Sequence, residues 1–271
     1  MVRIPAGIHK KTKHTNLETA ANAAYVNKGT CYWAFTNDEV CMKYKKIVSG
    51  KFISRPNRFI AHVDIQGQVE VCHVKNTGRC RELLQSGSVV YLEESDNPNR
   101  KTKYDLVAVW KGNMLVNMDS NAPNKVVQEW LNTQDCSILQ GKQKRFIKPE
   151  CKYGNSRIDF YVETDDRKIF MEVKGVTLEE NGVARFPDAP SERAVKHVKE
   201  LEAAVTEGYE TYVMFVIQMK GVKYFTPNID THPEFCQALR EAAEKGVQIL
   251  AYDCLVTEDS LVLDEPVEVR L

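Results

Sequence analysis

Two neighbouring segments of the chain carry the side chains best suited to chemistry. They read Arg-Ile-Asp-Phe-Tyr-Val at 157–162 and Lys-Ile-Phe-Met-Glu-Val-Lys at 168–174. Alternate residues of a β-strand share a face, so Asp159 lies opposite its aliphatic neighbours, and Glu172 and Lys174 lie together on one face of the second segment. The pattern predicts a β-hairpin with one charged face and one face that enters the core.

The predicted register of this hairpin brings two carboxylates together. A turn centred on Asp165-Asp166 sets Asp159 opposite Glu172. Facing carboxylates repel by roughly 0.2–1 kcal/mol unless a cation lies between them. Magnesium prefers oxygen ligands and usually takes one or two carboxylates with water and phosphate oxygens. We therefore predict that Asp159 and Glu172 bind Mg²⁺ or Mn²⁺, and that Lys174 acts on the attacking water or on developing phosphate charge.

The same spacing has a simpler interpretation. Glu-x-Lys on a strand is short and common, and an exposed hairpin face can carry charges that only form surface salt bridges. From the spacing alone, a metal site and a salt-bridged face are both open, and so is the question of whether the protein is an enzyme.

The distribution of charge predicts two modules. The 271 residues exceed one average domain, and 43% hydrophobic with 27% charged residues is ordinary for a globular protein. The formal net charge is +0, but residues 43–104 carry 12 Lys/Arg against 6 Asp/Glu, whereas residues 105–271 carry 20 against 28. A basic binding module followed by an acidic module fits this asymmetry.

Cysteine usage and hydropathy point to a reducing compartment. The eight cysteines contain no C-x-x-C pair, which excludes zinc-ribbon spacing. The longest apolar run, at 212–217, is strand-sized, and no charged-then-apolar leader is present at the start. We expect a cytoplasmic protein with no membrane partner, and the sequence leaves its oligomeric state open.

The fold predicted from the pattern is all-β followed by α/β. Residues 1–42 are expected to be an extension of unknown order, residues 43–123 a small OB-like β-barrel, and residues 124–271 a mixed-sheet α/β domain, with the turn cluster at 121–124 as the boundary. The barrel strands are expected at 59–65, 69–74, 88–92, 104–110 and 114–118.

The second domain is expected to alternate helices and strands after the hairpin. Helices are predicted around 126–131, 191–205 and 233–244, strands at 212–217 and 247–252, and a loop at 182–190. An apolar stripe that begins at Ala194 marks the middle helix, whereas Arg193, Lys196 and His197 lie off that stripe. Glu129 lies on a face of the first helix next to its apolar face.

Basic and short polar side chains gather in or beside the loops of the predicted barrel. They are Arg55, Arg58, Lys75, Asn76, Thr77, Arg79, Arg81, Arg100, Lys101 and Lys103. Phosphate contacts come largely from Arg, Lys, short polar side chains and turn amides. The barrel is therefore predicted to bind nucleic acid through phosphates, without the helix-turn-helix spacing that reads bases. A solvated basic rim is the alternative.

With these residues in view, the chain from about Tyr44 onward resembles the sugar fermentation stimulation protein family, SfsA. The matching motifs are Asn57-Arg58-Phe59, Asn76-Thr77-Gly78-Arg79, Lys152-Tyr153-Gly154-Asn155-Ser156-Arg157-Ile158-Asp159-Phe160, Glu172-Val173-Lys174, Phe186-Pro187-Asp188-Ala189 and Lys196-His197. The resemblance implies an OB-like N-terminal domain, a C-terminal domain of the PD-(D/E)-x-K type, which is restriction-endonuclease-like, and non-specific DNA binding with a regulatory role in sugar (maltose) metabolism.

The resemblance also implies roles for particular residues. Asp159 and Glu172 would be metal ligands, Lys174 the catalytic lysine, and Glu129 the acidic residue that some members place on the preceding helix. The "PD" half of the motif reads Ile158-Asp159 here, without proline. Arg193 and His197 join the barrel residues in the expected nucleic-acid-binding set.

Three hypotheses follow for the function. The leading one is a largely sequence-non-specific DNA-binding protein with a Mg²⁺-dependent or Mn²⁺-dependent nuclease-type site that hydrolyses phosphodiesters. The second is a non-catalytic DNA-binding regulator that uses the nuclease fold as a scaffold. The third is a structural charge cluster in a protein that binds another polyanion. The fold alone does not decide among them, and the sequence leaves open DNA or RNA and single or double strands.

Overall fold

The computed structural model describes residues 42–271, apart from residues 77, 135 and 140–144. The predicted extension at 1–42 therefore lies outside the described residues except for Met42, which forms the short strand β1 (Met42–Lys43). Within the described residues no helix has both the length and the apolar character needed to cross a bilayer.

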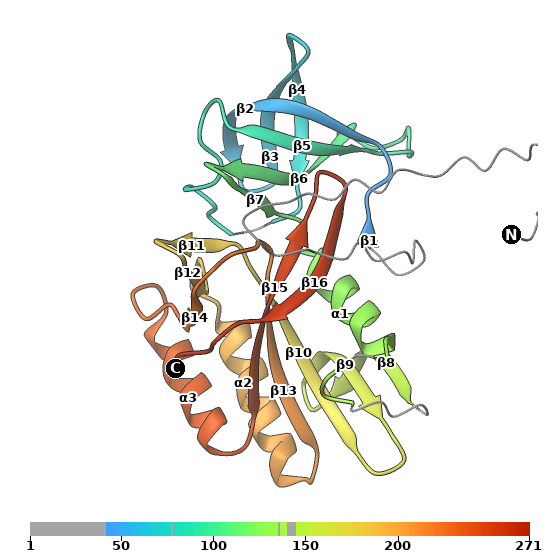
Figure 1. Ribbon diagram of the computed structural model, residues 1–271, viewed down its shortest axis with the longest axis vertical. Helices are drawn as coiled ribbons and strands as arrows, with labels where there is room; N and C mark the ends of the chain where they lie inside the picture. The colour runs from blue at the N-terminus through green and yellow to red at the C-terminus, as the bar shows by residue number, and fades with distance from the viewer. Residues whose placement is uncertain (1–41, 77, 135, 140–144) are drawn as a thin grey trace, which may run out of the picture. The chain divides into compact units, whose positions relative to one another are not determined.

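The N-terminal part is a closed five-stranded β-barrel with one additional strand. Its strands are β2 (Ile47–Asn57), β3 (Ile60–Ile65), β4 (Gln68–Val74), β5 (Val89–Glu94), β6 (Tyr104–Lys111) and the additional β7 (Met114–Asn117). They follow the order β4-β3-β2-β5-β6-β7, and a parallel pairing of β4 with β6 closes the barrel (Figure 1). Phe52, Val63 and Leu106 are buried inside it. The predicted OB-like barrel is confirmed.

The C-terminal part is built on a seven-stranded mixed sheet of order β1-β16-β15-β13-β10-β9-β8. The strands after β1 are β8 (Phe146–Tyr153), β9 (Ser156–Glu163), β10 (Lys168–Val176), β13 (Glu210–Ile217), β15 (Gln248–Val256) and β16 (Ser260–Pro266). The three central strands β10, β13 and β15 are parallel, and the outer pairings are antiparallel. This is the predicted mixed α/β arrangement.

Three helices cover the two faces of this sheet. They are α1 (Ala122–Asn132), α2 (Glu192–Thr206) and α3 (Pro233–Glu244). The buried residues Val198 of α2 and Leu239 of α3 belong to one core, and Val127 of α1 belongs to the other. Figure 1 shows α2 and α3 running side by side. Both faces are therefore covered, as parallel strands require.

The hairpin formed by β9 and β10 has the predicted register. Ile169 pairs with Val162 and Met171 with Phe160, and one further step places Asp159 opposite Glu172. The expectation of an open charged face was incomplete, because Phe170 on that face is also buried. Its ring packs against Tyr153, Tyr161 and Tyr209 at centroid distances of 4.9, 5.3 and 4.8 Å.

Several other elements differ from the sequence prediction. The predicted loop at 182–190 contains β12 (Val183–Phe186), which pairs with β11 (Leu178–Glu180) and β14 (Tyr224–Pro227) in a small separate sheet. The turn cluster at 121–124 is the start of α1, where Pro123 fits because the first helical turn needs no backbone donor from it. Strands β8 and β16 were also missed, since β8 is an edge strand whose residues are mostly exposed and do not alternate between apolar and polar.

A buried glutamine connects the barrel to the central sheet beside the charged hairpin. Gln218, directly after β13, donates its side-chain amide to Asn117 Oδ1 at 2.9 Å and to the Asp119 carbonyl at 3.1 Å. Its backbone N–H donates to the Val176 carbonyl at 2.9 Å. One residue therefore holds the end of β7 through its side chain and the end of β10 through its backbone.

This close approach makes Gly175 intolerant of a side chain. A Cβ there would lie 2.5 Å from Gln218 Oε1 and 2.8 Å from Pro123 Cγ. We expect Gly175→Ala to lower the free energy of unfolding by about 1–3 kcal/mol, because a packed interior must shift to admit the methyl group. Urea denaturation measures the change. Gln218→Ala should cost less stability in the Gly175→Ala background than in the parent, because there it also removes the close contact with the added methyl group, and an unchanged midpoint for Gly175→Ala would contradict the packing described.

Candidate metal and nucleic-acid site

Asp159 is held from two directions on β9. Its Oδ1 accepts a hydrogen bond from Asn124 Nδ2 of α1 at 2.9 Å, and its Oδ2 accepts one from the backbone N–H of Val173 at 2.8 Å. Burial, followed by the negative charge of Glu172, raises the pKa of Asp159. The two carboxylates therefore interact electrostatically, as the predicted register requires.

Glu172 on β10 is almost fully buried, with its side chain 2% exposed. Its Oε1 accepts hydrogen bonds from Lys174 Nζ, at 2.5 Å, and from His197 Nδ1 of α2. Burial by itself would raise the pKa of Glu172, but the hydrogen bonds and charges of these two partners lower it. Glu172 is thus held as a carboxylate at neutral pH.

The second carboxylate oxygen of Glu172 is left over. Its Oε2 is buried and has no hydrogen-bond partner among the described residues. A buried acceptor without a partner costs about 1–3 kcal/mol, or more for a charged group, and a bound cation would remove this cost. Oε2 of Glu172 and the carboxylate of Asp159, which Asn124 holds in position, together offer anionic oxygen ligands. Such ligands suit a hard divalent cation.

Glu129, the expected acidic residue of the first helix, is engaged elsewhere. Its Oε2 accepts a hydrogen bond from the backbone N–H of Met42 in β1 at 3.1 Å. The α1 residue that contacts Asp159 is Asn124. Five residues separate the two positions, which places them about 140° apart around the helix axis. The metal site proposed below therefore leaves out Glu129.

His197 was expected to contact nucleic acid, but the structure buries it against Glu172. It is 3% exposed. Its Nε2 accepts a hydrogen bond from Arg193 Nε at 3.4 Å, and because arginine is always the donor, Nδ1 carries the proton that is donated to Glu172. His197 is a positioning residue for the carboxylate. Arg193 itself is exposed at the surface.

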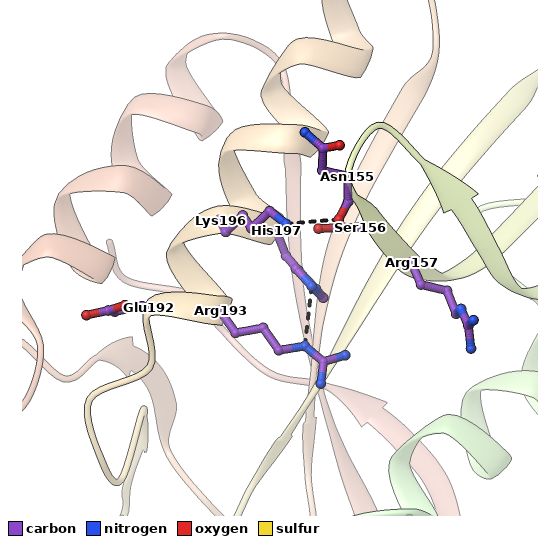
Figure 2. Close-up of a pocket in the computed structure, with 7 residues that line it drawn as sticks. All are labelled: Asn155, Ser156, Arg157, Glu192, Arg193, Lys196 and His197. Carbon is purple, nitrogen blue, oxygen red and sulfur yellow. Dashed lines mark hydrogen bonds between the residues drawn. The ribbon is translucent and has the colours of Figure 1, made fainter.

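A cleft of about 520 Å³ opens beside these residues, between the first turns of α2 and the turn that joins β8 to β9 (Figure 2). It is lined by Asn155, Ser156, Arg157, Glu192, Arg193, Lys196 and His197. Ser191 caps α2 by accepting the N–H of Ala194 at 3.2 Å. Lys196 Nζ donates to the Asn155 carbonyl at 2.9 Å and so joins the helix to the turn.

On the barrel, Arg55 is a structural residue. Its guanidinium donates to four backbone carbonyls, those of Gly78, Arg79, Arg58 and Asn76, at 3.0, 2.8, 2.8 and 2.7 Å. These bonds join the β2–β3 turn to the loop after β4. A side chain with this many fixed partners has little capacity left for phosphate.

A carboxylate of the protein itself bonds next to the loop that contains Asn76 and Gly78. The N–H of Gly78 donates to Asn76 Oδ1 at 2.8 Å, and the N–H of Cys80 donates to Asp188 Oδ2 at 2.9 Å. The carboxylate of Asp188 in the C-terminal domain therefore takes the backbone amide that directly follows the turn suggested for phosphate. Thr77, also predicted to bind, lies outside the described residues.

Some predicted phosphate ligands are paired within the barrel. Arg100 forms a two-pronged pair with Asp105 at 2.9 and 2.5 Å, and Lys103 lies 3.5 Å from Glu94. Burial alone would raise the pKa of Asp105, but hydrogen bonding to Arg100 and the charge of Lys75 lower it to about 2. Four predicted side chains are exposed and make no ion pair among the described residues: Arg58, Arg79, Arg81 and Lys101.

These pairings predict that Arg100 stabilises the fold, whereas Arg79 contributes to nucleic-acid binding. Arg100→Ala should lower the free energy of unfolding by about 1–3 kcal/mol, because it leaves the buried Asp105 without its two-pronged partner. Arg79→Ala should leave stability nearly unchanged and weaken nucleic-acid binding. Thermal melts and fluorescence anisotropy on both variants check this. Equal stability of the two variants would contradict the assignment.

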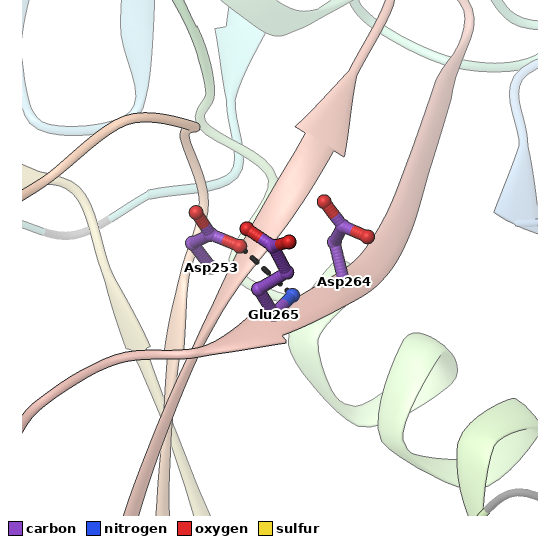
Figure 3. A group of neighbouring side chains, drawn as sticks. All are labelled: Asp253, Asp264 and Glu265. Carbon is purple, nitrogen blue, oxygen red and sulfur yellow. Dashed lines mark hydrogen bonds between the residues drawn. The ribbon is translucent and has the colours of Figure 1, made fainter. Parts of the chain in front are cut away.

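A second acidic group lies on β15 and β16. Asp253, Asp264 and Glu265 place one carboxylate oxygen each within 4.8 Å of one another (Figure 3). Lys220 Nζ contacts all three, at 3.0, 2.5 and 2.9 Å. Burial would lower the pKa of Lys220, but these carboxylates raise it, so an ammonium group supplies the cation here. Sequence reasoning missed this group because a register shift next to Asp253 brings it together.

Comparison with known proteins agrees with this architecture. The family model described as the SfsA N-terminal OB domain matches residues 53–118, and the one described as the sugar fermentation stimulation protein RE domain matches residues 121–260. Together these two matches cover most of both parts of the fold.

Named relatives and a solved structure extend the similarity over most of the chain. A sugar fermentation stimulation protein homolog of Ruminiclostridium cellulolyticum is 58% identical over 230 residues, which cover 85% of this chain and 100% of that protein. The homolog of Desulfitobacterium hafniense is 60% identical over 230 residues, covering 85% and 99%. The structure of Pyrococcus furiosus SfsA in complex with Ca²⁺ superposes with a TM-score of 0.76 at 27% identity, covering 85% and 99%. The chain therefore belongs to the sugar fermentation stimulation protein family.

Proposed function

We propose that this protein binds nucleic acid, DNA in the first instance, and hydrolyses phosphodiester bonds at a divalent-metal site formed by Asp159 and Glu172. The observation that carries the proposal is the buried, partnerless Oε2 of Glu172 beside a second carboxylate. The structure of the Pyrococcus furiosus relative in complex with Ca²⁺ supports a hard cation, since Ca²⁺ and Mg²⁺ both take oxygen ligands.

The residues around the site have distinct tasks. A bound Mg²⁺ or Mn²⁺ would supply a water molecule of lowered pKa and polarise the phosphate. Asn124 holds Asp159, and His197 holds Glu172 through the oxygen that is not left free. Lys174 bonds to Glu172 and, in this mechanism, would donate to the attacking water or to charge that develops on the phosphate.

Cleavage of labelled substrates tests the proposal. The parent protein and Asp159→Asn should be incubated with single-stranded, duplex and branched DNA and with RNA, in Mg²⁺, in Mn²⁺ and in EDTA. We expect cleavage by the parent with a divalent ion and near-background cleavage by the variant. Cleavage that survives in EDTA, or that Asp159→Asn retains, contradicts the site.

One observation favours the non-catalytic alternative, a DNA-binding regulator of sugar metabolism that keeps the nuclease fold as a scaffold. Lys174 and His197 both bond to Glu172, so the charge cluster is partly neutralised by the protein itself. The absence of cleavage on every substrate, with DNA binding intact, would favour this function. We place either activity in a reducing cytoplasm, where the free cysteines Cys72 and Cys80 would stay reduced.

The proposed binding is electrostatic, which predicts its salt dependence. If Arg58, Arg79, Arg81 and Lys101 each neutralise one phosphate, log affinity for duplex DNA should fall with log salt at a slope of about −3.6. Anisotropy titrations at several salt concentrations measure the slope, and Arg79→Ala should reduce it by about 1 for every sequence tested. A flat response would contradict phosphate binding by the barrel.

A further inference from the structure

The cleft beside α2 has the composition of an anion site. Three of its lining residues are cationic, Arg157, Arg193 and Lys196, and one, Glu192, is acidic. Figure 2 shows the Glu192 side chain directed away from Arg157 and Arg193. Lys196 donates to the Asn155 carbonyl and lies 3.9 Å from Glu200, so Arg157 and Arg193 are the two cations of the cleft that remain for a ligand. No Phe, Tyr or Trp side chain lines the cleft, so the charge and hydrogen-bond donors decide what it binds.

The two arginines of the cleft, Arg157 and Arg193, are available to a ligand. Arg193 uses only its Nε, toward His197, among the described residues, which leaves its terminal nitrogens free. Arg157 makes one contact, 3.3 Å from Glu150, between side chains that are 67% and 60% exposed. Such an exposed pair contributes little and is readily exchanged for a phosphate.

The cleft is connected to the metal site through one residue. His197 forms part of its wall, and the other nitrogen of the same ring donates to Glu172. On its far side the bond from Lys196 to the Asn155 carbonyl joins α2 to the β8–β9 turn. A nucleic-acid strand bound in the proposed active site would therefore have this basic cleft next to its reacting phosphate, closed on one side by the Lys196–Asn155 hydrogen bond.

From these features we infer that the cleft binds a terminal phosphate monoester of a nucleic-acid strand. The inference rests on the proposed function and names its substrate class. A monoester carries about −1.5 to −2 charge at pH 7, which matches the two guanidinium groups of Arg157 and Arg193, whereas an internal phosphodiester carries one negative charge. A protein with this site acts on strand ends that bear a phosphate.

Binding in EDTA tests the inference without any cleavage. The affinity of a short single strand labelled at its 3′ end is measured in two forms, one with a 5′-phosphate and one with a 5′-hydroxyl. A second strand, labelled at its 5′ end, is measured in the same way with a 3′-phosphate and with a 3′-hydroxyl. We expect one phosphorylated end to bind about tenfold more tightly than its hydroxyl counterpart, the value of a charge-assisted hydrogen bond. The two pairs show which end is recognised.

Variants assign the preference to the cleft. Arg157→Gln and Arg193→Gln should each remove most of the preference for the phosphorylated end. Lys199→Gln is the matched control, since Lys199 is an exposed cation of α2 that lines a different groove. Melting temperatures confirm that the variants fold, and Arg157→Lys should keep part of the preference because it keeps the charge.

Three results would overturn the inference. The first is equal affinity for phosphorylated and hydroxyl ends. The second is an equal loss of affinity for both ends in Arg157→Gln, which would make the cleft a site for internal phosphates. The third is a loss of the preference in Lys199→Gln as large as the loss in Arg157→Gln. The test is separate from the cleavage test. A preference for phosphorylated ends without any cleavage would support this inference and contradict the nuclease, and cleavage without a preference would do the reverse.

Discussion

Replacing Lys174 with alanine is expected to lower the cleavage rate by about 10²–10³ and to leave nucleic-acid binding nearly unchanged. A factor of this size is typical when one preorganised electrostatic donor is lost from an active site. Binding should persist because the exposed barrel cations, among them Arg58 and Arg79, supply the ground-state affinity, whereas Lys174 acts on the transition state. Single-turnover cleavage and anisotropy on the same preparation separate the two effects.

The control for this experiment follows from the structure. Lys174 also bonds to Glu172, so its removal changes the surroundings of a buried carboxylate as well as the chemistry. Lys111→Ala removes another half-buried lysine that pairs with a carboxylate, Glu179, without belonging to the site. It should leave cleavage unchanged. If the parent protein shows no cleavage above that of Lys174→Ala on any substrate, the enzyme function is excluded.

The second large effect is stabilisation by the metal. A ligand that binds only the folded state at a hundred times its Kd stabilises by about 2.7 kcal/mol. Mn²⁺ or Mg²⁺ should therefore raise the Tm of the parent, because the ion satisfies Glu172 Oε2 and relieves its repulsion with Asp159. The shift should be much smaller in Asp159→Asn, as measured by differential scanning fluorimetry.

A matched variant shows which acidic group is responsible. Asp264→Asn removes one carboxylate from the second acidic group, where Lys220 already supplies the cation. It should keep the full metal-induced rise in Tm. An equal rise in the parent and Asp159→Asn, with a smaller rise in Asp264→Asn, would show that the ion binds at the second group.

Local patterns in the sequence were sufficient for most of the elements and for the register of one hairpin, but not for β8, β12 or β16. Alternation around Asp159 and Glu172 gave both strand faces, and the short turn between them fixed the pairing, because a hairpin of this length has few registers. The stripe that begins at Ala194 gave α2, where Ala194, Val198 and Leu201 are buried as expected. Charge counts gave the basic barrel but not which of its cations are exposed.

The contacts that complete the site are long-range, and no local pattern specifies them. His197 lies off the apolar stripe of α2 and becomes buried only because Glu172 lies beneath it on β10. Asn124 contacts Asp159 because α1 packs against the sheet at that point. Arg55 and Arg100 have the same side chain as Arg79, and only the fold shows that the first two are occupied by partners in the chain.

The most direct test of the central claim is the position of the metal itself. Crystals grown or soaked with Mn²⁺ should be measured at the manganese absorption edge, where an anomalous difference map locates the ion without reference to activity. The account predicts a peak bonded to Asp159 and to Oε2 of Glu172. A peak confined to Asp253, Asp264 and Glu265, or no peak beside Glu172 at saturating Mn²⁺, would contradict it.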